Sequence, residues 1–292
     1  MAYALQPHHS YQARVALSDI EKHCTTAIFS DSYLSNPRLH SDWIREDADG
    51  RKKISLGPHM IVPDNNPEQF QHLSFIDNYS FGAAKMTTTC TTDRIVHQWA
   101  THMPRLTICH LGACDLANGP VGRVERPIMA RSAMQNHTHK FFRDLKEAGR
   151  RLAGQDRFNS ALQDHQFLLI GIPQWGEFEH VRRESLDWEH LKDVRRFAND
   201  GLRRAMSSLW QQHRALLFTP NMSWPTFNRR PDGTQDVHLD PATQRKYNDQ
   251  IFAMAAKMLC SFCKLDPENY DRRSHEAFKE SVAVCDRMQN PA

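Results

Sequence analysis

Five short apolar runs, separated by longer helical patterns, constrain the fold of this 292-residue chain more than any other feature. Each run contains β-branched or aromatic residues and leads into Gly, Pro, Ser, Asn or Asp. The runs are Cys24–Phe29, His72–Asp77, Leu106–Leu111, Phe167–Ile172 and Ala215–Thr219. Runs of this kind are typical of strands that are buried on both faces of a parallel sheet.

Amphipathic helical patterns lie between and after these runs. They cover Thr92–His102, Asn136–Leu152, Leu186–His213 and Pro241–Cys263. The last has the clearest start, because Asp240 suits an N-cap and a proline suits the first helical turn. Strands that alternate with helices predict a parallel sheet covered by helices on both faces. We therefore expect an α/β fold, a three-layer α/β/α sandwich around a five-stranded parallel sheet.

The predicted domain organisation is simple. Residues 1–265 form one domain, and residues 266–292 form a charged C-terminal segment with a short helix at Ser274–Met288. Between the first two strands, residues 35–71 are polar and broken by prolines and glycines. This insertion is either a surface excursion or a lid beside the active site.

Composition excludes several classes of protein. The net charge of +3 is too small to indicate a nucleic-acid partner. No run of about 18 apolar residues is present, so we expect no membrane span. The N-terminus lacks the pattern of a signal peptide, and the seven cysteines show no repeating framework. These features predict a cytoplasmic protein with reduced thiols.

Polar residues and glycines follow the predicted strands. The first strand runs into Ser30-Asp31-Ser32, at the sheet edge where open α/β sheets bind ligands. If a helical turn follows, the backbone N–H of Ser32 points into the same space. Gly82 follows the second strand and lets the backbone approach a ligand closely. Gly112 and Asp115 follow the third strand as a possible capped turn, and His238 lies on a short loop before the last helix.

In this order the motifs resemble those of the SGNH/GDSL hydrolases. That family carries Gly-Asp-Ser after the first strand, Gly after the second, Gly-x-Asn-Asp after the third and Asp-x-x-His before the last helix. The corresponding segments here are Ser30-Asp31-Ser32, Gly82, Gly112-Ala113-Cys114-Asp115 and Gln235-Asp236-Val237-His238. The resemblance spans Cys24 to Met258. It implies a flavodoxin-like sheet and hydrolysis of a small-molecule ester without a metal or organic cofactor.

The resemblance also implies roles for individual residues. Ser32 is similar to the family's nucleophile, which attacks an ester carbonyl to give an acyl-enzyme. His238 is similar to the general base. Oxyanion stabilisation and substrate binding fall to Gly82, Cys114 and Asp31, with the backbone N–H of Ser32 as a further donor.

Two positions depart from the family pattern. Cys114 stands where the family has an asparagine whose amide stabilises the oxyanion, and a thiol is a weak donor. Gln235 stands where the family has the aspartate that orients the histidine. We expect Asp236 to take that role, with Asp232, Gln235 itself or a backbone carbonyl as alternatives. A second hypothesis therefore remains open, in which the chain is a catalytically impaired SGNH-like domain that binds a ligand or partner.

Other motifs carry weaker hypotheses. Cys260 and Cys263 have zinc-like spacing, but there is no second Cys-x-x-Cys, so we expect no metal site. Trp175 and Trp224 follow the last two strands and either wall a substrate pocket or pack under a loop. A third hypothesis is that the chain is one domain of a larger multidomain protein.

Overall fold

The computed structural model describes residues 26–46, 48–50, 52–54, 76–86, 88–101, 104, 106–117, 119–154, 165–174, 188–213, 215–222 and 225–263. The predicted C-terminal segment, both tryptophans that follow the last two strands, and residues 47, 51 and 55–71 of the predicted insertion lie outside the described residues. The proposed division into a domain and a charged tail therefore stays a prediction.

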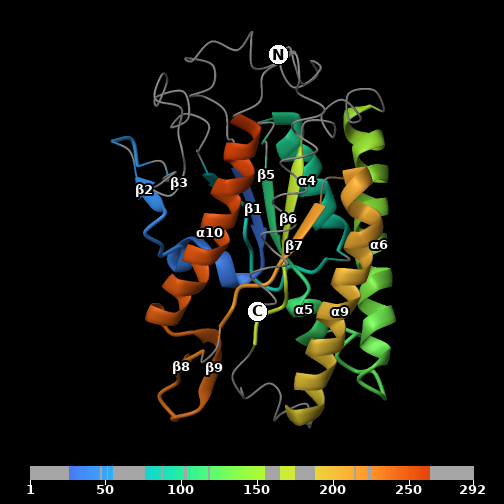
Figure 1. Cartoon of the computed structure of the whole chain (residues 1–292), viewed down its shortest axis with the longest axis vertical. Coiled ribbons are helices and arrows are strands. Elements are labelled where there is room, and N and C mark those ends of the chain that lie inside the picture. The colour runs from blue at the N-terminus through green and yellow to red at the C-terminus, as the bar shows by residue number, and fades with distance from the viewer. Residues whose placement is uncertain are drawn as a thin grey trace.

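A five-stranded parallel sheet forms the centre of the molecule (Figure 1). Its strands are β1 (Thr26–Ser30), β4 (Ile76–Asn78), β5 (Leu106–His110), β6 (Gln166–Ile170) and β7 (Ala215–Phe218). They lie in the order β4-β1-β5-β6-β7, and every pairing is parallel. This is the flavodoxin-like order. All residues of β1, β5, β6 and β7 are buried, as their apolar runs predict.

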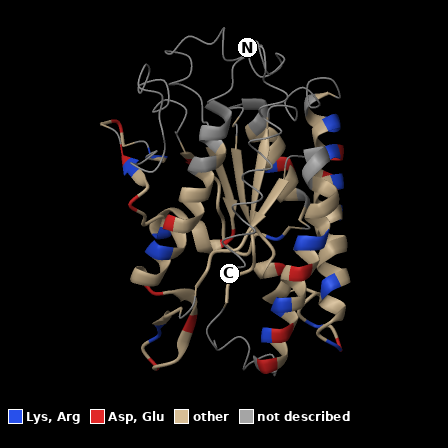
Figure 2. Ribbon diagram, in the orientation of Figure 1, with Lys and Arg blue, Asp and Glu red and all other residues tan. Residues whose placement is uncertain are grey.

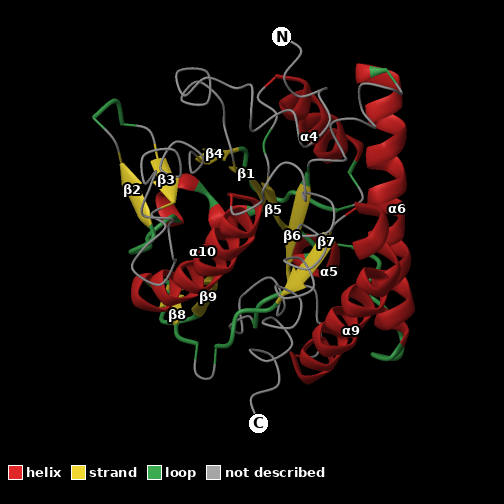
Figure 3. Cartoon of the chain, turned by 45° about the horizontal axis from the view of Figure 1, so that its top comes forward, coloured by secondary structure: helices red, strands yellow, loops and turns green. Residues whose placement is uncertain are grey.

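Helices cover both faces of this sheet, which confirms the predicted three-layer α/β/α fold. The helices α4 (Thr89–Thr101), α6 (Met129–Ala153) and α9 (Trp188–His213) lie side by side on one face, and α10 (Pro241–Cys263) covers the other (Figures 1 and 3). A short helix, α5 (Ala113–Ala117), follows β5. The four long helices match the four helical patterns of the sequence.

Close packing between α6 and α9 depends on a glycine. A Cβ atom added at Gly201 would lie 2.2 Å from the backbone oxygen of Arg131, so only glycine fits at this crossing. Arg131 also forms an ion pair with Asp200 across the two helices, at 2.5 Å. Charged side chains lie mostly on the outer helices and the hairpins, whereas the sheet is almost free of them (Figure 2).

The start of α10 is capped as the sequence predicts. Asp240 Oδ1 accepts hydrogen bonds from the backbone N–H groups of Ala242 and Thr243, at 2.9 and 3.1 Å. The apolar face of this amphipathic helix is buried in the core; it comprises Ile251, Met254, Ala255 and Met258. The cap and the apolar face together fix the segment that precedes α10 against the sheet. None of the described helices has an apolar stretch long enough to cross a membrane.

Small elements surround the carboxyl ends of the strands. Two 3-10 turns, η2 (Ser32–Leu34) and η3 (Asn36–Arg38), follow β1. The described part of the predicted insertion continues into an antiparallel hairpin of β2 (Ile44–Glu46) and β3 (Lys52–Ile54). A second hairpin pairs β8 (Phe227–Arg229) with β9 (Gln235–Leu239) just before α10. The sequence predicts a loop at β9, so this strand is a correction.

Candidate active site

Ser32 begins the 3-10 turn that follows β1, which lies between β4 and β5 in the sheet. Asp31 caps this turn: its Oδ1 accepts a hydrogen bond from the backbone N–H of Tyr33 at 3.0 Å. The Ser32 side chain therefore stands at the carboxyl edge of the sheet, on a short backbone segment held by its own cap.

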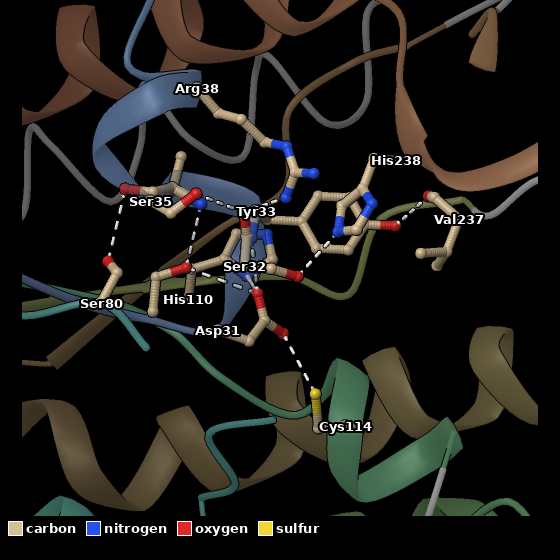
Figure 4. Close-up of polar contacts among 12 residues, drawn as sticks. Asp31, Ser32, Tyr33, Ser35, Arg38, Ser80, His110, Cys114, Val237 and His238 are labelled. Atoms are coloured by element: carbon tan, nitrogen blue, oxygen red, sulfur yellow. Dashed lines mark hydrogen bonds and ion pairs between the residues drawn. The ribbon is translucent and has the colours of Figure 1, made fainter. Parts of the chain in front are cut away.

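The structure brings Ser32 and His238 together. Ser32 Oγ lies 2.7 Å from His238 Nε2, although the two residues are 206 positions apart in the chain (Figure 4). The histidine lies on β9, which leads directly into α10 and contacts it. This distance is that of a hydrogen bond between a hydroxyl and a neutral imidazole.

The other ring nitrogen of His238 faces Asp236. His238 Nδ1 lies 3.4 Å from Asp236 Oδ2. Alternate residues of a strand point to the same side, which explains why a carboxylate two positions before the histidine reaches it. Gln235 is exposed, and the Asp232 carboxylate instead accepts hydrogen bonds from Thr234. Of the side chains considered from sequence, Asp236 is the one that contacts the ring.

The electrostatic surroundings keep this histidine neutral. Burial lowers the pKa of His238 from its usual 6.5, and the positive charge of Arg38 lowers it further. Asp236 opposes both effects but does not outweigh them. Burial alone would raise the pKa of Asp236, but His238, hydrogen bonds and Arg230 together hold it below its usual value. A neutral imidazole beside an ionised carboxylate is the resting state that a general base requires.

Gly82 lies in an exposed turn after β4. The segment leading to it is tied to the Ser32 turn, because Ser80 Oγ donates a hydrogen bond to the Leu34 carbonyl at 3.3 Å. Beyond the turn, the buried carboxylate of Asp115 accepts a hydrogen bond from the Met86 backbone N–H at 2.8 Å. The chain around Gly82 is thus fixed at both ends next to Ser32.

Cys114 points to Asp31. Its Sγ lies 3.8 Å from Asp31 Oδ2, on the far side of Asp31 from the Ser32 hydroxyl (Figure 4). Burial, followed by the charges of Asp31 and Asp115, raises the pKa of this thiol to about 12. The sulfur therefore stays protonated at neutral pH, with Asp31 as its hydrogen-bond acceptor.

A buried polar network lies beneath the Ser32 turn. The Asp31 carboxylate is 1% exposed, and its Oδ1 lies 3.4 Å from Nδ1 of the equally buried His110. On the opposite side of that ring, His110 Nε2 lies 2.8 Å from the Tyr247 hydroxyl. The sequence identified Asp31 as a residue of the site, but not His110 or Tyr247. A histidine inside an apolar run gives no signal that separates it from an ordinary strand residue.

Tyr33 joins this network to His238. Its ring stacks on His110, with centroids 5.1 Å apart, and lies tilted against His238 at 5.5 Å. Its hydroxyl donates a hydrogen bond to the Val237 carbonyl at 2.7 Å. The tyrosine therefore holds β9 in place beside Ser32.

Arg38 was also missed by sequence reasoning. Its Nη1 donates a hydrogen bond to the Ser32 carbonyl at 2.7 Å, so its guanidinium lies directly above Ser32 in Figure 4. An arginine in a polar, proline-broken segment looks like any other surface residue in a single sequence.

No group of three or more His, Cys, Asp or Glu side chains is arranged to hold a metal ion within the part of the chain that the structure describes. Helix α10 includes Cys260 and Cys263 at its end.

No protein-family model matches the sequence, and no curated protein matches it. A search of solved structures finds a carbohydrate acetylesterase from Sinorhizobium meliloti, with 13% identity and a TM-score of 0.46. It also finds an aryl esterase from M. smegmatis, native and inhibitor-bound, with 13% identity and a TM-score of 0.44. Each match covers 80% of this chain and 98% of the other.

Proposed function

We propose that the protein is a serine ester hydrolase in which Ser32 is the nucleophile and His238 is the general base. The observation that carries this proposal is the 2.7 Å contact between Ser32 Oγ and His238 Nε2 at the carboxyl edge of the sheet. Asp236 at 3.4 Å supplies the orienting carboxylate. That distance is long for a charge-assisted hydrogen bond, and such contacts tighten when substrate binds.

The first half-reaction transfers the acyl group to the enzyme. Ser32 Oγ attacks the ester carbonyl carbon while His238 Nε2 takes the hydroxyl proton. The Nδ1 proton stays on the ring and faces Asp236, whose negative charge stabilises the imidazolium. The tetrahedral intermediate then collapses: the C–O bond to the alcohol breaks, and the departing oxygen takes the proton from Nε2. The alcohol leaves, and the acyl group remains on Ser32.

Water completes the cycle by the same route. His238 Nε2 takes a proton from a water molecule as its oxygen attacks the acyl-enzyme, and then returns that proton to Ser32 Oγ. The products are a carboxylic acid and free enzyme. No external oxidant, reductant or cofactor is needed for this balance.

The negative charge on the carbonyl oxygen requires donors. We assign this role to the backbone N–H groups of Ser32 and Gly82, on two segments that are fixed side by side. The Cys114 thiol is directed to Asp31, so we leave it out of the donor set. A missing oxyanion donor costs about 3 kcal/mol, so we expect a rate about 10²–10³-fold below that of a three-donor site.

The direction of the Cys114 thiol, toward Asp31, supports a second candidate function. If two backbone donors are insufficient, the protein binds esters or related ligands without turning them over. The two candidates share the fold and the site around Ser32, and differ only in whether Ser32 becomes acylated.

The test is turnover of 4-nitrophenyl acetate by the wild-type chain and by Ser32→Ala, with labelling by a fluorophosphonate probe as a second readout. We expect burst release of nitrophenol and probe labelling in the wild type, and loss of both in Ser32→Ala. Ser35→Ala is the matched control, because its hydroxyl lies one helical turn away and donates a hydrogen bond to the Ser32 carbonyl. Equal rates for wild type and Ser32→Ala would exclude Ser32 as the nucleophile. Absence of both turnover and labelling in the folded wild type would favour the binding module.

A further inference from the structure

A guanidinium lies beside the nucleophile with no part in the acyl transfer just described. Arg38 Nη1 donates to the Ser32 carbonyl at 2.7 Å, and the side chain is only partly buried. Arginine carries five N–H donors in a planar fork, and within the described part of the chain this hydrogen bond uses one of them. Among the residues that the structure describes, no carboxylate lies within ion-pair distance of Arg38.

Helix α10 fixes the position of this arginine. The buried Asn248 donates a hydrogen bond from Nδ2 to the Arg38 carbonyl. The neighbouring amide of Gln244, also buried, donates to Asn248 Oδ1 at 2.8 Å and to the Tyr33 carbonyl at 3.0 Å. Both ends of the segment from Tyr33 to Arg38 are thus held by one pair of amides. The backbone that carries Arg38 is therefore held in place, and the bond from Nη1 to the Ser32 carbonyl positions the guanidinium beside Ser32. This lowers the entropic cost of binding a ligand there.

The charge of Arg38 is unfavourable for the proposed chemistry unless an anion accompanies it. His238 becomes an imidazolium when it takes the Ser32 proton, and the nearby guanidinium opposes that charge, as its effect on the resting pKa of the histidine shows. A neutral substrate leaves the two positive charges facing each other. A negatively charged group bound to Arg38 would cancel the repulsion at the step where the imidazolium forms.

The side of the site on which Arg38 lies indicates which part of a substrate it meets. His238 returns its proton to the leaving oxygen, so the alcohol portion of an ester must lie on the His238 side of Ser32. Figure 4 shows the Arg38 guanidinium on that side, across Ser32 from Asp31 and Cys114. The alcohol portion is therefore the part of the substrate within its reach.

We propose that Arg38 binds a carboxylate on the alcohol portion of the ester, so that the preferred substrates are esters of carboxylate-bearing alcohols or phenols. The planar guanidinium matches the two oxygens of a carboxylate in geometry and charge. This inference rests on the proposed hydrolase function for the orientation of the substrate.

The first experiment measures binding without chemistry. Dissociation constants of 3-acetoxybenzoate and of the neutral 3-acetoxybenzamide are measured on Ser32→Ala by calorimetry. A hydrogen bond to a charged group contributes about 1.5–3 kcal/mol, so we expect the carboxylate to bind at least about tenfold more tightly. Adding Arg38→Gln should reduce the two constants to within about twofold of each other, because the charged partner is gone. Equal constants in the Ser32→Ala background alone would overturn the inference.

Two further variants separate local from general effects. Arg38→Lys keeps the charge and should retain part of the preference, and it serves where Arg38→Gln does not fold. Arg143→Gln removes the same charge from α6, where the side chain is 75% exposed, and should leave the preference intact. A preference lost equally in Arg143→Gln would reflect general attraction and would overturn a specific site.

The second experiment measures release of the phenol from the same two esters by the wild-type chain. We expect kcat/KM to favour 3-acetoxybenzoate, and Arg38→Gln to lose that preference. Selective binding without turnover of either ester would overturn the hydrolase and leave the carboxylate site standing. Turnover of both esters with equal binding and equal kcat/KM would overturn the carboxylate site and leave the hydrolase standing.

Discussion

Two sets of the same three groups, a carboxylate, an imidazole and a hydroxyl, lie on either side of the Tyr33 ring. We call Asp236, His238 and Ser32 the surface set, and Asp31, His110 and Tyr247 the buried set. In the surface set the histidine side chain is 15% exposed and its carboxylate 27%; in the buried set both are 1% exposed. The hydroxyl of the buried set stays protonated, because burial and then the charge of Asp31 raise the pKa of Tyr247 well above 10.

The surface set and the buried set contain the same three chemical groups, but we expect them to have different roles. In the buried set no substrate can reach the hydroxyl, and each group serves as the hydrogen-bond or ion-pair partner of the next. In the surface set the hydroxyl stands at the carboxyl edge of the sheet, where ligands of open α/β folds bind. We therefore expect substitutions in the surface set to affect rate, and substitutions in the buried set to affect stability.

The largest expected effect separates the two histidines. His238→Asn should lower kcat for 4-nitrophenyl acetate by about 10⁴-fold or more, because no group then takes the serine proton. His110→Asn should lower the free energy of unfolding by about 1–3 kcal/mol, because buried partners lose a hydrogen bond, and should change kcat by less than about tenfold. Initial rates and urea titrations measure the two quantities. A rate loss of equal size in both variants would remove the distinction between the sets.

Next come the two aspartates near β9. Asp236→Asn should lower kcat by about 10²–10³-fold, less than the 10⁴ of a buried protease aspartate, because the contact is longer and partly exposed. Asp232→Asn is the matched control, since its exposed carboxylate accepts hydrogen bonds from Thr234 and, among the described residues, is not a hydrogen-bond or ion-pair partner of His238, and it should leave kcat unchanged. A larger loss in Asp232→Asn than in Asp236→Asn would assign the orienting role to the other residue.

A smaller effect is expected in the buried set. Tyr247→Phe removes the hydroxyl that contacts His110 Nε2 at 2.8 Å, and should cost about 1 kcal/mol of unfolding free energy. The rate of ester hydrolysis should change by less than about threefold, because the ring still packs against the histidine. Chemical unfolding and initial rates on the same preparation check both parts. A large rate loss at full stability would mean that the buried set takes part in the reaction.

The smallest effects are shifts along the pH axis. General-base catalysis needs neutral His238, so kcat/KM should rise with pH through the histidine pKa, with its midpoint below 6.5. Removing a positive charge should raise that midpoint in Arg38→Gln, and removing a negative one should lower it in Asp236→Asn. Arg143→Gln should leave it in place. Shifts in the same direction for the first two variants would contradict this electrostatic picture.

Much of the fold could be predicted from the sequence, because burial of strands and helix faces leaves a periodic pattern. All five strands of the sheet and the four long helices follow apolar runs or stripes, and Asp240 caps α10 as expected. The prediction of a loop before α10 was wrong, because this segment forms β9. A three- to five-residue strand in a peripheral hairpin, here β9 against β8, has too little apolar pattern to reveal itself.

The site was predictable only in part. Ser32 follows a recognisable strand and His238 precedes a recognisable helix, and the fold brings their side chains into contact. Arg38 and Tyr33 could not be found, because they contact segments that are about 200 residues away in the chain. Tyr247 was missed for the same reason, since its partner His110 lies 137 positions away. Such contacts depend on how α10 packs against the first turn, and a single sequence carries no record of that packing.

The hairpin that carries His238 has a consequence for recognising related chains. On β9 Asp236 and the proposed general base His238 lie two residues apart, next to an irregularity in the pairing with β8. A pattern that demands Asp-x-x-His would pass over such a chain and score it as inactive. The motif to search for is Asp-x-His-x-Asp-Pro, in which the strand sets the first spacing and the capped helix sets the second.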